Sequence, residues 1–195
     1  AREALVEGDN VIAFHVHNTS GGALADIGLY KNDLGFHPGY RAIAGMADEG
    51  PWEAKVKKVA MSGTTWTQED YNDESWETEM GAFGTKGEYP NINTNWTATG
   101  SDYYIRRYIT LTAEDLKKEL ALIYSHDDVC QAYINGRRVV SVGNSWHQNV
   151  VYDLTADDKA VLHEGTNVIA FHVHNTTGGA LADIGLYENI RNEAK

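Results

Sequence analysis

The chain is short of cysteine, of long apolar runs and of basic charge, and each shortage excludes a class of protein. Cys130 is the only cysteine, so no disulfide can form within the chain. No run approaches the 18 apolar residues that a membrane-spanning helix needs. Acidic residues outnumber basic ones by 28 to 16, which gives a formal charge of −12, and the basic residues are scattered. Without a basic patch the chain is unsuited to nucleic acid and to anionic membranes, so a neutral partner is favoured.

The rest of the composition is that of an ordinary folded protein. Hydrophobic residues make up 42% and charged residues 23% of the 195 positions. A chain of this length buries one good core but not two, so one domain plus a fragment is expected.

A long repeat is the most informative feature. Leu5–Asn32 and Leu162–Asn189 agree at 24 of 28 aligned positions, at an offset of 157 residues, and the similarity stops at both ends. A repeat of this kind at domain-sized spacing indicates tandem duplication. We therefore expect residues 1–32 to be the closing strands of a preceding repeat and residues 51–189 to be a complete module. Residues 33–50 would connect them, as a flexible linker or a packed strap, and residues 190–195 would be a tail.

Short segments rich in Val, Ile, Tyr and Thr alternate with Gly, Asn and Asp, which is the pattern of a β-sandwich. In the C-terminal copy of the repeat, Ile169, Phe171 and Val173 fall on one face of a strand and should enter the core, whereas His172 and His174 fall on the other face. The expected strands are Ala54–Met61, Tyr103–Leu111, Glu119–Ser125, Val129–Ile134, Arg137–Val142, Gln148–Asp153, Asn167–His174 and Ala182–Leu186.

Local signals predict the connections between these strands. Asn135-Gly136 supplies the positive φ angles of a two-residue hairpin turn. Thr112–Leu116 and Thr155–Leu162 each open with Thr and carry an acid three residues later, which predicts short capped helical turns. The polar run Ser125–Asp128 is not expected to form a catalytic relay, because chain neighbours cannot adopt relay geometry, and Asp127 and Asp128 are expected to shape the turn before Val129.

Five segments occur in an order that matches a known kind of module. They are WTQEDYNDESW (Trp66–Trp76), GAFG (Gly81–Gly84), YYIRRYITL (Tyr103–Leu111), HDDVCQAYINGRRV (His126–Val139) and LHEGTNVIAFHVHNTTGGALADIGL (Leu162–Leu186). Together they resemble the galactose-binding-like β-jelly-roll accessory module of secreted bacterial glycoside hydrolases and related secreted glutaminase-type amidohydrolases. The resemblance implies an all-β, two-sheet antiparallel jelly-roll sandwich with short helical crossovers. It also implies a non-catalytic module, secreted or at the cell surface of a bacterium, without naming a ligand.

The aromatic residues suggest carbohydrate binding, because sugar C–H faces stack on aromatic rings and sugar hydroxyls bond to nearby polar groups. Trp66 and Trp76 lie within the resembling segments and are expected in the core. Trp146, Trp96 and Trp52 stand among polar residues, where each would either stack on a ligand or anchor its loop. The candidate ligand-binding residues are Trp146, His147, Asn144, Arg137, Trp96 and Trp52.

Metal binding is a further candidate. His172 and His174 lie two residues apart on one strand face, so both rings can reach one ion, with Asp183 or His126 as a third ligand. The same histidines are also acceptable as ordinary residues of a half-buried strand. A structural calcium ion held by loop carboxylates and carbonyls is the alternative, and no other cofactor is expected.

Two hypotheses for function follow. The first is a non-catalytic carbohydrate-binding accessory module of a secreted multidomain protein that occurs as tandem repeats, with a glycan or polysaccharide as partner. The second is a structural repeat of an extracellular fibre or adhesin, in which residues 5–32 exchange strands with neighbouring repeats or copies of the chain.

Overall fold

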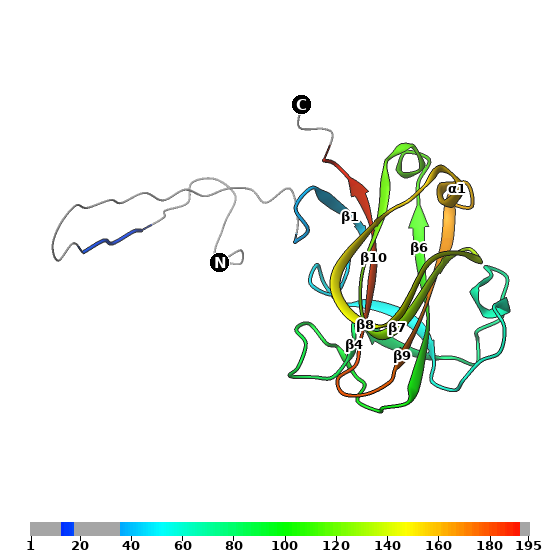
Figure 1. The fold of residues 1–195 in the computed structure, drawn as a ribbon. Helices are drawn as coiled ribbons and strands as arrows, with labels where there is room; N and C mark the ends of the chain where they lie inside the picture. The colour runs from blue at the N-terminus through cyan, green and yellow to red at the C-terminus, as the bar shows by residue number, and fades with distance from the viewer. Residues whose placement is uncertain (1–12, 18–35, 192–195) are drawn as a thin grey trace. The chain divides into compact units, whose positions relative to one another are not determined.

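The computed structural model describes residues 13–17 and 36–191 (Figure 1). The chain divides into two units, residues 1–32 and 33–195, and each is described by itself. In the first unit, residues 13–17 have no regular secondary structure, and Phe14 and Val16 expose their side chains. The predicted closing strands of residues 5–32 otherwise lie outside the described residues, as does most of the predicted tail.

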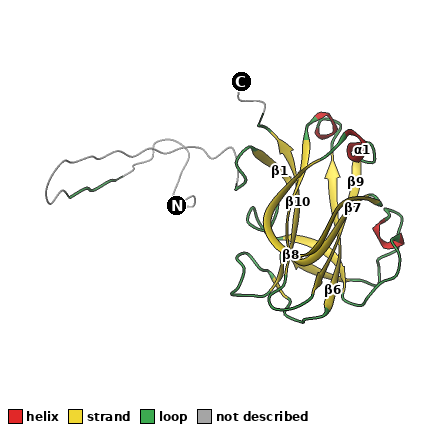
Figure 2. Cartoon of the chain, viewed as in Figure 1, coloured by secondary structure: helices red, strands yellow, loops and turns green. Residues whose placement is uncertain are grey.

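The second unit consists mainly of strands, with three short helical turns between them (Figure 2). The strands are β1 (Tyr40–Ala44), β2 (Trp52–Lys57), β3 (Glu77–Gly81), β4 (Phe83–Gly84), β5 (Thr94–Asn95), β6 (Ser101–Leu111), β7 (Leu120–Ile134), β8 (Arg137–Asp153), β9 (Gly165–Asn175) and β10 (Leu181–Asn189). The helical turns are η2 (Thr65–Thr67), η3 (Asp115–Lys117) and α1 (Ala156–Lys159).

The strands form two layers that share β7. One layer has the order β3-β2-β6-β9-β7, and the other has the order β7-β10-β4-β5, with β1 beside β10 and β8 along β7. β7 pairs with β10 through residues 120–127 and with β9 through residues 129–134. Apart from the parallel pair β4 and β5, the pairs between these strands are antiparallel. The all-β jelly-roll prediction is confirmed.

β7 and β8 are each one long strand where the sequence predicted two. The predicted pieces Glu119–Ser125 and Val129–Ile134 correspond to the two halves of β7 that pair with different neighbours. Between these halves the register with β8 shifts, first after Tyr124 and again after Asp128. Such shifts are bulges that bend a strand, so β7 passes from one layer to the other without a loop. The run Ser125–Asp128 therefore lies within a strand, and the prediction of a turn there was wrong.

The core lies between the layers and follows the predicted alternation. Ile169, Phe171 and Val173 of β9 are buried in the main cluster, whereas His172 and His174 are partly exposed. Alternation also divides β10. Its residues Ala182, Ile184 and Leu186 enter the main cluster, and Tyr187 packs on the opposite face in a separate cluster. Trp66 and Trp76 are buried in a third cluster, as expected.

Residues 36–50, here called the strap, are packed against β10. β1 pairs with β10 so that Tyr40 lies opposite Asn189. The backbone N–H of Met46 donates to the hydroxyl of Tyr187 at 2.7 Å. Gly185 permits this close approach, because a Cβ there would lie 2.7 Å from the carbonyl oxygen of Ala44. The described residues 36–50 thus pack on β10 through a strand pairing and a buried hydrogen bond.

The predicted hairpin turn at Asn135-Gly136 and the predicted capped turn at Thr155 are present. Asn135 and Gly136 have φ angles of 46° and 87°, as a two-residue hairpin requires. At α1, the hydroxyl of Thr155 accepts from the N–H of Asp158, and the carboxylate of Asp158 accepts from the N–H of Thr155. This reciprocal cap satisfies two backbone donors at the start of the helix.

Candidate ligand-binding site

A pocket of about 60 Å³ lies where the strap, β7, β8 and β10 meet. Ser125 of β7 and Asp183 of β10 form its floor, since the two residues are paired across the strands and therefore point to the same face. The walls come from three other parts of the chain: Met46 and Asp48 of the strap, Tyr89–Asn91 from the loop after β4, and Gln148-Asn149 of β8. Leu181 completes the lining.

The bulge in β7 and β8 shapes the wall at Gln148 and Asn149. The backbone of Asn149 has a positive φ of 55°, and its N–H donates to the hydroxyl of Ser125 at 2.9 Å. These two β8 residues fall between the partners of Tyr124 and His126, where the register shifts. An irregular stretch of strand can aim polar side chains at a ligand in a way that a regular ladder cannot.

Asp183 gives the pocket a buried carboxylate. Its two oxygens accept from the indole N–H of Trp52 at 2.9 Å and from the backbone N–H of Ala47 at 3.0 Å. Burial raises the pKa of Asp183 to about 6, although these hydrogen bonds and the charge of Arg107 favour the ionised form. The two hydrogen bonds hold the carboxyl group in place at the floor of the pocket.

Asp48 adds a second carboxylate to the lining. Its Oδ2 lies 3.2 Å from Nε2 of His37, which also belongs to the strap. Its Oδ1 is buried and has no hydrogen-bond partner among the described residues. Together with Asp183, this oxygen makes the pocket rich in acceptors, so a ligand that offers hydroxyl or amine donors suits it best.

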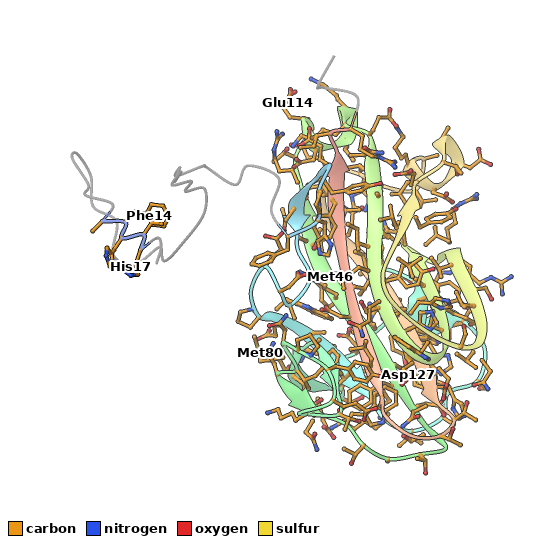
Figure 3. All side chains as sticks on the ribbon, turned by 60° about the vertical axis from the view of Figure 1, so that its left-hand side comes forward. Phe14, His17, Met46, Met80, Glu114 and Asp127 are labelled. Carbon is orange, nitrogen blue, oxygen red and sulfur yellow. The ribbon has the colours of Figure 1, made fainter. Side chains whose placement is uncertain are left out.

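Trp146 of β8 is not part of the pocket lining and is linked to it through Asp127. It is paired with Asp127 of β7, so the two side chains share a face, and Asp127 accepts from the hydroxyl of the pocket residue Tyr89 at 2.7 Å. Burial and this carboxylate raise the pKa of Tyr89. The indole of Trp146 is 60% exposed. Aromatic rings supply stacking surface at ligand sites, and a few polar groups beside them fix the orientation of a ligand. Figure 3 shows Met46 and Asp127 among the side chains of this unit.

Three predicted site residues lie together on β8, in a strand and not in the expected loop. They are Asn144, Trp146 and His147. Asn144 accepts from the hydroxyl of Thr176 at 3.0 Å. His147 is paired with His126, and their ring centres are 5.4 Å apart. Because side chains alternate along a strand, Asn144 and Trp146 share one direction and His147 has the other.

The other three predicted site residues lie elsewhere in the fold. Trp52 is 6% exposed, with Arg107 4.4 Å from its ring and its N–H bonded to Asp183. Trp96 is 5% exposed and bonds to Ser101. Both have the anchoring role that was the alternative to ligand stacking. Arg137 lies at the far end of the β7–β8 hairpin, where its Nε donates to Asp158 at 2.8 Å.

The metal candidates do not converge on one site. His172 and His174 both contact Oδ1 of Asp102, at 2.7 and 2.9 Å, whereas Asp183 bonds to Trp52 and Ala47. His126 directs Nδ1 at the carbonyl oxygen of Asp128. Within residues 13–17 and 36–191, no group of three or more His, Cys, Asp or Glu side chains is placed to hold a metal ion. A structural calcium ion remains an untested prediction.

Sequence reasoning missed several lining residues of the pocket, namely Asp48, Tyr89, Asn91 and Ser125. Gln148 and Asn149 could have been predicted as site residues from the sequence, since they closely follow Trp146 in the chain. Tyr89–Asn91 carries the one local hint, because a Pro-Asn pair after an aromatic residue indicates an ordered loop. No local sequence pattern identifies Asp48 as a pocket residue, because Asp48 comes close to β10 only when the strap is folded.

Comparisons with known proteins give structural matches only. No family model matches the chain, and no curated protein matches it. Among solved structures, Bacteroides uniformis beta-glucuronidase matches with a TM-score of 0.51 at 15% identity, over 71% of this chain and 18% of that one. Bacteroides uniformis beta-glucuronidase 2 covalently bound to cyclophellitol-6-carboxylate aziridine matches with a TM-score of 0.50, also at 15% identity, over 71% and 18%.

These matches bear on the fold. At 15% identity they support a sandwich of the kind found within larger glycosidase chains. This chain spans less than a fifth of the length of those enzymes. In the described part of the chain, no helix is long and apolar enough to cross a membrane.

Proposed function

We propose that this chain is a non-catalytic carbohydrate-binding accessory module of a larger secreted bacterial protein. One observation carries the proposal: the exposed indole of Trp146 is linked through Asp127 to a pocket whose lining offers the carboxylates of Asp48 and Asp183. A sugar ring stacks on the indole through its C–H face, and its hydroxyls donate to the carboxylate and amide oxygens of the pocket.

The small matched share of the glycosidase structures supports an accessory role. The likeness covers 18% of those chains, so the sandwich is one part of a much longer enzyme. The acidic charge of −12 favours neutral glycans over anionic ones. Binding by one such module is weak, and repetition of the module raises the avidity through effective concentration.

Calorimetric titration with the best ligands from a neutral glycan panel tests the proposal. We expect Trp146→Ala to weaken binding by about tenfold or more, since an aromatic stacking contact contributes about 1.5 kcal/mol. The melting temperature should stay unchanged because the ring is exposed. Val59→Ala removes an equally exposed apolar side chain after β2 and serves as the matched control.

Two results would contradict the proposal in different ways. If the unaltered chain binds no member of the panel, carbohydrate binding itself fails. If it binds and Trp146→Ala binds equally well, the ligand sits elsewhere on the module.

A structural repeat of a fibre or adhesin is the second candidate function. The observation that favours it is the exposure of Phe14 and Val16, whose counterparts Phe171 and Val173 are core residues. Under this hypothesis the surplus copy links the module to neighbouring repeats or to copies of itself.

A further inference from the structure

The two closing strands of the module occupy a site that a second, nearly identical segment of the chain also fits. β9 lies between β6 and β7, and β10 lies between β7 and both β1 and β4. Four side chains that β9 and β10 place in the core, Phe171, Val173, Ile184 and Leu186, recur unchanged in residues 5–32. We call the place of β9 and β10 the closing slot and residues 5–32 the N-terminal copy.

The same residues are buried in one copy and exposed in the other. Phe171 and Val173 are 0% exposed, whereas Phe14 and Val16 are 51% and 43% exposed (Figure 3 labels Phe14). Each phenylalanine gains a similar free energy from entering the slot, because hydrophobic stabilisation follows the apolar area that is buried. The chain thus carries two closing segments for one slot.

The register of β1 shows how the N-terminal copy reaches the slot. Tyr40 lies opposite Asn189, and the residue equivalent to Asn189 is Asn32. With the N-terminal copy in the slot, Asn32 would face Tyr40, and residues 33–39 would form the loop of an antiparallel hairpin. A loop of this length connects neighbouring antiparallel strands without strain, so the exchange needs no second molecule.

Three of the four differences between the copies fall on exposed positions of the slot. His163, Thr166 and Thr177 are exposed, and Val6, Asp9 and Ser20 replace them in the N-terminal copy. Thr177 contributes its backbone N–H to Asp128, which serine supplies equally well. Val6 would lose the contact of His163 Nε2 with Glu69, at 2.6 Å, but both of these side chains are exposed, so these three differences discriminate only weakly between the copies.

The fourth difference does discriminate. Glu188 is buried, and its Oε2 lies 3.0 Å from Arg41 and 3.5 Å from Lys118. The N-terminal copy has Lys31 at this position. A lysine there would replace two attractive contacts by two repulsive ones in a partly desolvated site.

We propose that the closing slot accepts either copy within the same chain, and that Glu188 with Arg41 and Lys118 selects the C-terminal copy. Lys31 is the residue that disfavours the N-terminal copy. Reversing the charges at these two positions reverses the selection. The exchange would also replace the pocket residues Leu181 and Asp183 by the identical residues Leu24 and Asp26.

Unfolding of full-length variants provides the first test. Phe171→Asp places a charge in the core and so destabilises the C-terminal copy in the slot. Lys31→Glu gives the N-terminal copy the same residue that the C-terminal copy has at Glu188. We expect the chain with both changes to unfold cooperatively, at a higher temperature than Phe171→Asp alone. Adding Phe14→Asp to the pair should abolish the folded state, whereas Phe14→Asp alone should leave the melting temperature unchanged. If the melting temperature of the double variant Phe171→Asp/Lys31→Glu is no higher than that of the triple variant, the proposal is overturned.

Cys130 allows a direct test of occupancy. It lies opposite Val173 in the β7–β9 register, so Val16→Cys would place a second thiol opposite Cys130 only when the N-terminal copy fills the slot. We compare Val16→Cys alone with Val16→Cys in the Phe171→Asp/Lys31→Glu background. Under an oxidant, we expect the second chain to form at least about tenfold more of this disulfide, because its substitutions shift the population towards the N-terminal copy in the slot. Val173→Cys in the otherwise unaltered chain controls for the geometry of the pair.

The size of the cross-linked product decides between exchange within a chain and exchange between chains. A monomeric product supports the proposal, and a disulfide-linked dimer overturns the assignment to one chain. The unfolding comparison stands independently of the cross-link, so a failure of the thiol pair to oxidise does not rescue the proposal.

Discussion

Among single residues, Asp183 makes the stability of the module depend on pH in an uncommon direction. Its pKa is raised from 3.8 to about 6 by burial, with Asp48 adding to the rise and Arg107 opposing it. Between about pH 4 and 6 the folded chain holds a proton that the unfolded chain has released. The contribution of Asp183 is therefore fully present below pH 4 and is lost as the pH rises through 6.

We expect this loss to reach about 3 kcal/mol, the equivalent of two pKa units. Urea unfolding of the unaltered chain and of Asp183→Asn, at intervals from pH 4 to pH 7, measures it as the difference between the two curves. Other titrating groups cancel in that difference. Parallel curves would show that Asp183 titrates at an ordinary pKa in the folded chain.

Arg106 is the charged residue on which the fold depends most. It is completely buried on β6, donates to Asp73 at 2.6 Å, and also donates to the carbonyl oxygens of Trp66 and Gln68. Arg106→Met removes the donor of two carbonyl oxygens and the buried cation beside Asp73, which keeps only the hydroxyl of Tyr108, and should cost about 3–5 kcal/mol of unfolding free energy. Arg138→Met, at an exposed position, is the control and should change it by less than about 0.5 kcal/mol. Equal effects in denaturant titrations would refute the role of Arg106.

Burial of individual residues is where the sequence was least informative. Trp52 and Trp96 stand among polar neighbours in the chain, yet both are buried, because the residues that cover them come from distant strands. Trp146 has equally polar neighbours and is exposed. The three tryptophans cannot be told apart from local sequence, since burial is decided by contacts across the sheets. By contrast, the inward side of β9 follows from alternation alone.

Among the elements, the β7–β8 hairpin is the one most clearly encoded in sequence. Gly136 has a φ of 87°, a conformation that costs other residues about 1–2 kcal/mol. We expect Gly136→Ala to lower the unfolding free energy by at least that amount, because the added Cβ would also lie 2.4 Å from Oε1 of Gln68 and displace that side chain. Gly143→Ala on the same strand meets nothing within 4 Å and should be near neutral. Chemical denaturation of both variants checks the difference, and equal losses would contradict the turn assignment.

Elements were predictable where their signals are local and unpredictable where they depend on partners. The Asn-Gly turn and the Thr155–Asp158 cap require only neighbours in the chain. β1 escaped prediction because its glycine-rich surroundings suggest a linker, and its strand conformation comes from pairing with β10. The split predicted in β7 has a similar origin, since the polar run at 125–128 marks a change of partner and not an end.

For the whole molecule, we expect residues 1–32 to add little to stability. The described part of that segment exposes Phe14 and Val16, and the slot they fit is filled by β9 and β10. Removing residues 1–32 should shift the melting temperature by less than about 2 °C. Light scattering across a concentration series should find both versions monomeric. Assembly of the longer version alone would favour the fibre or adhesin function.

The pairing of β1 with β10 also determines how the module responds to force. Tyr40 and Asn189, at the two ends of the packed chain, are direct partners in an antiparallel ladder. Tension applied through both ends therefore opens the ladder one pair at a time, as in unzipping, and never loads its hydrogen bonds together. A module attached in this way yields at low force and detaches the strap before the sandwich is disturbed. Such compliance suits a domain that hangs beside its neighbours better than one that transmits tension along a fibre.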